Sequence, residues 1–284
     1  MIVSNGRDFL PVLFLPFRKA GPFMRVNSLP RSVLLAKFSL LAIAPFVTTV
    51  FSAVSVSGAD SDPTPRAVKG KLVFSDDFQR TELGSAWKVG IPGYQISDGV
   101  LRGIQAKSDH GSSVGTSLPL PSGDFHLELR FRFEGAKSIN INLDDKAFKG
   151  VHAGHISRVV IRPPTLILMD DKEGVMRNDI RALRKSNDPE MKAEGDRMSA
   201  GATKKVPVKI RPGQWYKLNV EIVGDRMRVM IDDQRVGSLQ SPGLAHPTKP
   251  DLRIGVWGEG EEAWFDDLRI WSVRPVASVV SGSR

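Results

Sequence analysis

Apolar and polar residues alternate along several short segments of the chain, and this period of two predicts β-strands. The clearest segment is FHLELRFRF at 125–133, where five apolar side chains alternate with polar ones. Alternate side chains of a strand point to opposite faces, so this segment would bury one face. YKLNVEIV at 216–223 alternates likewise, and the turns Gly224-Asp225 and Asp232-Asp233 join it to RMRVMI and QRVGSL. We therefore expect a meander of three antiparallel strands here.

Further strands are predicted elsewhere, and one stretch breaks the pattern. The additional strand segments are 99–106, 138–143, 156–162, 165–170, 252–257 and 263–272. Many short antiparallel strands at close spacing predict an all-β sandwich or jelly roll. Residues 172–200 are instead rich in charge and in helix formers. We expect a surface insertion there with one or two short helices, broken near Pro189.

The composition is that of a globular protein and excludes several kinds of functional site. The 284 residues are 41% hydrophobic and 25% charged, which is typical of a soluble globular protein. The chain has no cysteine, which excludes disulfides, cysteine-ligated metals and thiol catalysis. The net charge is +9, but residues 1–59 hold six basic residues and one acidic residue, which leaves +4 for the rest. Because that remaining charge is scattered, nucleic acid is not an expected partner.

The N-terminal segment indicates export. Arg25, Arg31 and Lys37 precede the apolar run FSLLAIAPFVTTVFSAVSV, and small residues follow at 57–59. We expect residues 1–59 to be an export signal, with translation starting at Met24 and cleavage after Ala59. An uncleaved membrane anchor is the alternative, and would be the chain's link to a membrane. The mature protein would then be extracytoplasmic (periplasmic or secreted).

The rest of the chain divides into three parts. The polar, proline-containing segment 60–70 is expected to be a linker. Residues 71–272 hold the predicted strands and would form the single domain. Residues 273–284 follow as a tail.

Three segments carry a resemblance to a known superfamily. DDFQRTELGSAW at 76–87 and YQISDGVLRG at 94–103 resemble the start of concanavalin A-like jelly rolls, the lectin and glucanase superfamily. GVWGEGEEAWFDDLRIW at 255–271 is similar to the last two strands of that superfamily. Within it, the chain is most similar to the 3-keto-disaccharide hydrolase domain. The resemblance covers roughly residues 71–272 and implies a sandwich of antiparallel strands.

The resemblance implies that the first and last strands lie side by side. Phe74, Phe78, Trp264 and Phe265 would then share one end of the core, and Trp87 and Trp215 are also assigned to the core. The acidic pairs Asp76-Asp77 and Asp266-Asp267 would be close in space. Such carboxylates either pair with neighbours such as Arg80 and Arg269 or hold a structural calcium ion.

The most suggestive stretch for chemistry is INLDDKAFKGVHAGHISRVVI at 141–161. It gathers Asp144, Asp145, His152, His155 and Arg158 around a loop between two strands. Histidine beside a carboxylate can perform general acid–base catalysis, because its pKa lies near neutrality. The alternative is that the two aspartates form a turn and the histidines cap strand ends.

Three further residues are candidates for contact with a substrate. Asp170 ends the strand that follows, beside the same loop, although a solvated turn is the alternative there. Trp257 could stack on a sugar ring or pack in the core, and Glu259 follows it among glycines. The Glu-x-Asp-x-x-Glu strand motif of the related glucanases is absent, and Glu194-Gly-Asp196 lacks the third acid.

Together these features predict an exported carbohydrate-active domain. The resemblance implies hydrolysis of 3-keto-glycosides, with His152 or His155 as the base and Asp144, Asp145, Asp170 or Arg158 positioning the sugar. No further cofactor is expected. The alternatives are a carbohydrate-binding module without catalysis and a purely structural sandwich.

Overall fold

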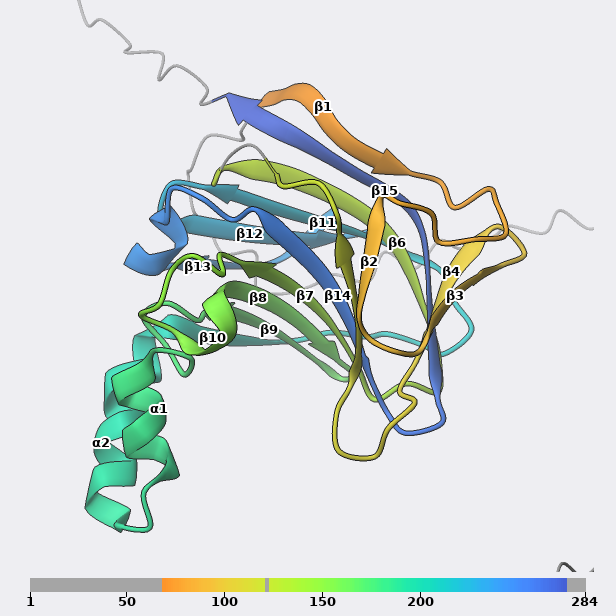
Figure 1. Cartoon of the computed structure of the whole chain (residues 1–284). Coiled ribbons are helices and arrows are strands. Elements are labelled where there is room, and N and C mark those ends of the chain that lie inside the picture. Colours follow the sequence, from red (N-terminus) through yellow and green to blue (C-terminus); the bar gives the residue numbers. More distant parts are fainter. Residues whose placement is uncertain (1–67, 121–122, 275–284) are drawn as a thin grey trace, which may run out of the picture. The chain divides into compact units, whose positions relative to one another are not determined.

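The computed structural model describes residues 68–120 and 123–274, and they form a sandwich of two antiparallel β-sheets (Figure 1). The predicted all-β jelly roll is therefore confirmed. The strands are β1 (Val68–Asp76), β2 (Trp87–Ile91), β3 (Tyr94–Ser97), β4 (Val100–Ile104), β5 (Ser112–Thr116), β6 (Phe125–Glu134), β7 (Ser138–Asp144), β8 (His155–Arg162), β9 (Thr165–Asp170), β10 (Thr203–Pro207), β11 (Tyr216–Val223), β12 (Arg226–Ile231), β13 (Gln234–Gln240), β14 (Asp251–Trp257) and β15 (Glu262–Arg274).

Neighbours in each sheet come from distant parts of the chain. One sheet has the order β13-β12-β11-β6-β15-β4-β3, with β1 also paired to β15. The other has the order β10-β9-β8-β7-β14-β5-β2. The predicted meander is β11-β12-β13, and its second turn places Asp232 and Asp233 at positive φ, as a tight hairpin turn requires.

Alternation along the strands builds the core between the sheets. In β6, the five apolar residues from Phe125 to Phe133 are at most 2% exposed. They face the inner residues of the other sheet, such as Ile139 and Ile141 of β7, in one hydrophobic cluster. The polar residues of both sheets are therefore directed to the two outer faces.

The first and last strands lie side by side, as the resemblance implied. β1 pairs with the second half of β15, with Phe74 opposite Ile270 and Asp76 opposite Leu268. β4 occupies the same side of β15 along its first half. A bulge with Asp267 at a φ of 51° separates the two halves. Both halves of β15 are thus covered, and the strand presents no free edge there.

The acidic residue Asp76 accepts hydrogen bonds from its neighbours. Arg80 donates from Nη1 and Nη2 to its two oxygens at 2.6 and 2.7 Å, and Trp87 Nε1 donates at 2.6 Å. Burial works to raise the pKa of Asp76, but these bonds and the Phe78 amide outweigh it and hold the pKa below its usual value. Nearby, burial and the charges of Asp267 and Asp77 raise the pKa of Asp266. In the described part of the chain, no three acidic or histidine side chains are grouped as cation ligands.

Two of the expected core aromatics lie on an outer face instead. Phe265 is fully buried, so its strand neighbour Trp264 points outward, between the guanidinium groups of Arg102 and Arg132. Trp215 is half-buried and contacts Arg130 and Arg132. The prediction of core positions for Trp264 and Trp215 was wrong. Trp264 follows the strand alternation and lies on the face opposite Phe265, and arginine side chains that pack on the rings stabilise both tryptophans outside the core.

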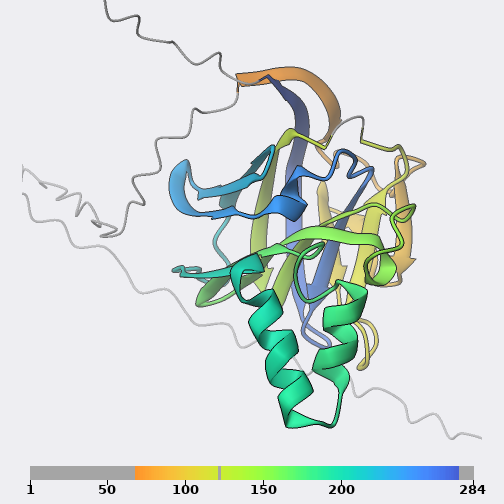
Figure 2. The ribbon, with the colours of Figure 1, turned by 90° about the vertical axis from the view of Figure 1, so that its left-hand side faces the viewer.

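The helical insertion forms a hairpin at one side of the sandwich (Figure 2). It consists of α1 (Asn178–Lys185) and α2 (Pro189–Ser199), within the predicted segment 172–200. Pro189 occupies the first turn of α2, and the side chain of Asp188 caps this helix by accepting from the Glu190 amide. The chain passes from β9 through the hairpin to β10, so the helices stand beside the sheet that contains β7 and β8.

Several expectations fall outside the described residues. The export signal at 1–59, most of the linker at 60–70 and the end of the tail at 273–284 are among them. Within the described ranges, no helix is long and apolar enough to cross a bilayer.

The role of Asp76 can be tested by Asp76→Asn, which removes the charge that Arg80 and Trp87 bond. We expect a loss of about 2 kcal/mol of unfolding free energy at neutral pH, because two charge-assisted bonds are weakened. Because the folded-state pKa is lowered, this stabilisation exists above the ordinary value of 3.8 and is lost as the pH falls through the folded pKa. Urea denaturation at pH 7 and at about pH 2.5 should show a gap between wild type and variant that closes in acid. Asp77→Asn is the matched control, since Asp77 is exposed and should change stability by no more than about 0.5 kcal/mol.

Candidate functional site

The outer face of the sheet containing β7 is polar and hollowed. In β7, Ile139, Ile141 and Leu143 face the core, so Ser138, Asn140 and Asn142 face outward. Register with β8 and β14 brings Arg158 and Arg253 beside Asn142 on the same face. A regular strand pattern thus gathers amide, hydroxyl and guanidinium groups over the centre of the sheet.

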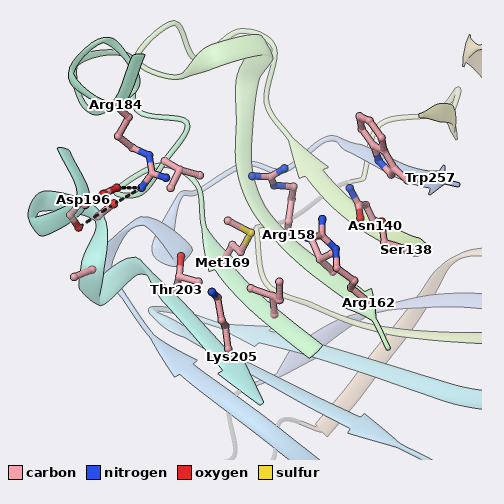
Figure 3. A pocket seen from close by; sticks show the side chains of 15 residues that line it. Ser138, Asn140, Arg158, Arg162, Met169, Arg184, Asp196, Thr203, Lys205 and Trp257 are labelled. Carbon is pink, nitrogen blue, oxygen red and sulfur yellow. Dashed lines mark hydrogen bonds and ion pairs between the residues drawn. The ribbon is translucent and has the colours of Figure 1, made fainter. Parts of the chain in front are cut away.

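Two adjoining hollows lie on this face. The first, here called the histidine hollow, has a volume of about 670 Å³ and lies over β5, β14, β7 and the start of β8. The second, called the basic hollow, has a volume of about 740 Å³ and lies between β7–β10 and the helical hairpin. Asn140, Arg158 and Trp257 line both hollows, so the two adjoin and form one groove. Figure 3 shows these three residues at the basic hollow.

His155 and Asp144 form a bonded pair at the end of β7 and β8. The two residues lie opposite each other in the strand register, and His155 Nδ1 is 2.7 Å from Asp144 Oδ1. The Asp144 side chain is 2% exposed and that of His155 is 21% exposed. Arg253 Nε lies 3.5 Å from the other oxygen of Asp144. A buried carboxylate that accepts from Nδ1 fixes the imidazole with Nε2 as its free nitrogen, which is the arrangement of a general base.

A tight turn before β8 positions His155. Gly154 has a φ of 78°, and a Cβ there would lie 2.6 Å from the carbonyl oxygen of Asp145. The Gly154 carbonyl accepts from the Asp145 amide at 2.8 Å, which closes the loop over the end of β7. A glycine is therefore required at 154 for His155 to meet Asp144.

The floor of the histidine hollow contains polar atoms without partners. Asn142 and Ser113 line this hollow, and their Oδ1 and Oγ atoms are buried with no hydrogen bond among the described residues. An unpaired buried polar atom is costly, so such atoms commonly bond a ligand or an ordered water.

Trp257 stands at the junction of the two hollows. Its side chain is among the exposed large apolar ones, at 41% of its surface. With the Asn140 amide oriented to satisfy both of its groups, Asn140 Oδ1 accepts from Trp257 Nε1 at 3.1 Å. A Cβ at Gly111 would lie 2.5 Å from the ring, so this loop packs closely on the indole. Trp257 is thus a fixed, exposed aromatic surface of the kind that stacks on sugar rings.

His152 lines the same hollow from the turn before β8. Its ring centroid is 6.3 Å from that of His155. Partial burial lowers the pKa of His152, the nearby positive charges of Arg181 and Lys185 lower it further, and the shift favours the neutral, basic form near pH 7. Both predicted histidines therefore lie in one hollow.

Asp145 and Asp170 do not line the groove, contrary to their expected contact with a substrate. Asp145 accepts from Thr248 Oγ1 at 2.6 Å and lies 3.0 Å from His246 Nε2. Asp170 accepts from the hydroxyl of Ser241 and the amide of Gly243. Both carboxylates are buried and hold the segment before β14, so their acceptor oxygens are used within the fold.

Of the two remaining candidates for substrate contact, one lines the groove and the other does not. Arg158 lines both hollows, with its guanidinium bonded to the fully buried Asp171 at 2.8 Å from Nη2. Glu259 is exposed in the loop after β14 and lines neither hollow. The expected substrate contact of Glu259 is therefore not supported by its position.

Several groove residues were missed at the sequence level. They are Ser113, Asn140, Asn142, Arg162, Lys205 and Arg253. A pattern was present in β7, where polar residues occupy every second position, and at the start of β14, where Asp251 and Arg253 do. This pattern could not identify the groove residues, because alternation does not indicate which of the two outer faces carries a site.

The tautomer of His155 provides a direct test of its pairing. We expect the neutral form of His155 to carry its proton on Nδ1, because Asp144 accepts there. Nitrogen-15 NMR of the imidazole side chains should show this form in the wild type and a mixture of tautomers in Asp144→Asn. Asp145→Asn is the matched control, because it should disturb His246 and leave the His155 signals in place. Unchanged His155 signals in Asp144→Asn would contradict the pairing.

Comparison with known proteins agrees with this architecture. A family model described as a 3-keto-alpha-glucoside-1,2-lyase-like domain matches residues 74–271. No curated protein matches the sequence.

Solved structures with similar folds include carbohydrate-active proteins of low sequence identity. The laminarinase from Rhodothermus marinus aligns with a TM-score of 0.50 at 12% identity, over 73% of this chain and 99% of that one. The carbohydrate-binding module CBM66 from Bacillus subtilis aligns with a TM-score of 0.44 at 15% identity, over 67% and 98% of the two chains. These likenesses concern the fold. The family match covers most of the chain, and the protein therefore belongs to the 3-keto-alpha-glucoside-1,2-lyase-like domain family, a family of carbohydrate-active jelly rolls.

Proposed function

We propose that the protein cleaves the glycosidic bond of 3-keto-glycosides, with the reacting sugar in the histidine hollow. The observation that carries this proposal is the Asp144–His155 pair, whose imidazole lines the hollow and is bonded to the buried carboxylate through Nδ1. The family match supports the type of substrate.

A base is the group that such a substrate needs. A 3-keto group acidifies the neighbouring C2–H, so His155 Nε2 takes this proton and an enolate forms. The C1–O bond then breaks, a C1–C2 double bond forms, and the aglycone leaves as an alkoxide that takes a proton from water. The hydroxide left behind is neutralised by the proton that His155 took. Addition of water across the double bond completes hydrolysis. A positioned base contributes about 10²- to 10⁴-fold to such a step.

The cations of the hollow suit the charge that develops. Arg253 and Arg158 line it and could stabilise the enolate oxygen, as fixed positive groups do for developing oxyanions. Asn140 and Asn142 line the hollow where sugar hydroxyls would lie, and Trp257 would cover one side of the ligand.

Cleavage by a pair of carboxylates has less support. The carboxylates that line the two hollows are Asp144 and Asp196. Asp144 is bonded to His155, and Asp196 Oδ1 lies 2.6 Å from Arg184 Nη1. Neither is placed as the free acid that ordinary glycoside hydrolysis requires. Elimination through a histidine base uses the groups that are available.

The site of action is proposed to be outside the cytoplasm. The basic and apolar pattern before Ala59 supports export, and amino-terminal sequencing of the mature protein would find Asp60 first if cleavage follows that residue.

Replacement of His155 tests the proposed reaction. Incubation with a 3-keto-α-glucoside should release aglycone, and His155→Ala should lower kcat by at least about 100-fold, because the base is lost. A deuterium atom at C2 should slow the wild type if proton removal limits the rate. His110→Ala is the matched control, because His110 lines the same hollow but lies on an exposed loop beside Asp109.

The outcomes separate the proposal from its alternatives. Equal release by wild type and His155→Ala would contradict the assigned base. If glycans are retained by the protein on an affinity gel without any turnover, the domain is a binding module instead.

A further inference from the structure

The basic hollow contains positive charges that no described residue pairs. Its lining includes Arg158, Arg162, Arg184 and Lys205, with Asp196 as the one lining carboxylate. Arg184 is paired with Asp196, and Arg158 with Asp171. Arg162 and Lys205 are exposed, and their side chains have no hydrogen bond or ion pair in the described part of the chain.

Strand register places these two cations on the same face. Arg162 lies opposite Thr165 of β9, and Lys205 of β10 lies opposite Ile167, two residues further along β9. Between them the floor is formed by Val160, Ile167 and Met169, and Figure 3 shows Arg158, Arg162, Lys205 and Met169 around this space. The hollow therefore combines an apolar floor with cations around it.

On the opposite outer face of the sandwich, arginine side chains are paired with acidic residues. There Arg130 bonds Asp266, Arg228 bonds Glu221 and Arg269 bonds Asp267. Mixed charges of this kind are the ordinary condition of a protein surface. Uncompensated cations in a concave surface instead raise the local concentration of anions.

We propose that the basic hollow is a subsite for an anionic leaving group, the part of the glycoside that carries a carboxylate or a sulfate. The inference rests on the proposed function, because the histidine hollow would hold the reacting sugar. The two hollows meet at Trp257 and Arg158, so a glycoside that crosses this junction places its aglycone over Val160 and Met169. Arg162 and Lys205 then bond the anionic group, and the apolar floor contacts the carbon skeleton.

The experiment compares three 3-keto-α-glucosides that differ in one substituent of the aglycone. The aglycones are 4-hydroxybenzoate, 4-hydroxybenzenesulfonate and the neutral 4-hydroxybenzamide. We expect Arg162→Gln and Lys205→Gln each to lower kcat/KM for an anionic substrate by about tenfold, the size of one charge-assisted hydrogen bond. The value for the amide should stay within about twofold. We compare the drop in kcat/KM for the carboxylate substrate with the drop for the sulfonate substrate. The larger drop indicates which anionic group the subsite binds better.

Lys209→Gln is the matched control. Lys209 is exposed and basic, lies just after β10 and does not line the hollow. Its removal changes the net charge of the protein by the same amount and should leave the preference for anionic substrates intact. Thermal melts of all three variants verify that they are folded.

A binding measurement keeps this inference separate from the proposed function. The unoxidised glucosides of the same phenols lack the 3-keto group, and calorimetry gives their affinities without turnover. Tighter binding of the anionic glucosides, lost in Arg162→Gln, supports the subsite even if no 3-keto-glycoside is cleaved. Suppose instead that the protein cleaves the amide substrate yet shows no preference for anionic substrates, either in kcat/KM or in affinity. That result would contradict the subsite and would leave the proposed function intact. The subsite is likewise overturned if Lys209→Gln weakens anion binding as much as Arg162→Gln does.

Discussion

The structure depends on the burial of one face of every strand between two sheets. Alternate residues of β6 and β7 pack together in a core from which most charged side chains are absent. Everything polar is consequently placed on the outer faces, at the spacing of the strand repeat. On the face with β7, β8 and β14, this spacing sets Asn140, Asn142 and Arg253 beside one another. The strand residues of the site are thus the polar residues that alternate with the apolar residues of the core.

The two outer faces share a fold but differ in what their side chains can do. On the sheet containing β15, the aromatic rings of Trp215, Trp264 and Trp271 are covered by lysine or arginine groups. Its charges are largely matched in pairs. On the sheet containing β7, Trp257 is exposed, and two cations lack partners among the described residues. That difference is why we place the carbohydrate on the second face.

The sequence contained much of the fold and a smaller part of the site. Alternation in Phe125–Phe133 predicted β6, and the resemblance to concanavalin A-like jelly rolls correctly implied that β1 and β15 are neighbours. The approach of His155 to Asp144 followed from a loop that joins two adjacent strands. By contrast, Asp145 and Asp170 are oriented by Thr248 and Ser241, about 70 residues or more away in the sequence. No local pattern reveals such partners, and for the same reason Trp215 and Trp264 could not be placed.

The central claim is that the reacting sugar lies in the histidine hollow with its C2 facing His155. A crystal structure of the His155→Ala protein with a bound 3-keto-α-glucoside measures this directly. Our account predicts the ring between Asn142 and Arg253, with the C2 hydrogen directed at the space left by the imidazole. A sugar bound over Trp215 and Trp264, or one in the hollow with C2 turned away from position 155, would contradict it.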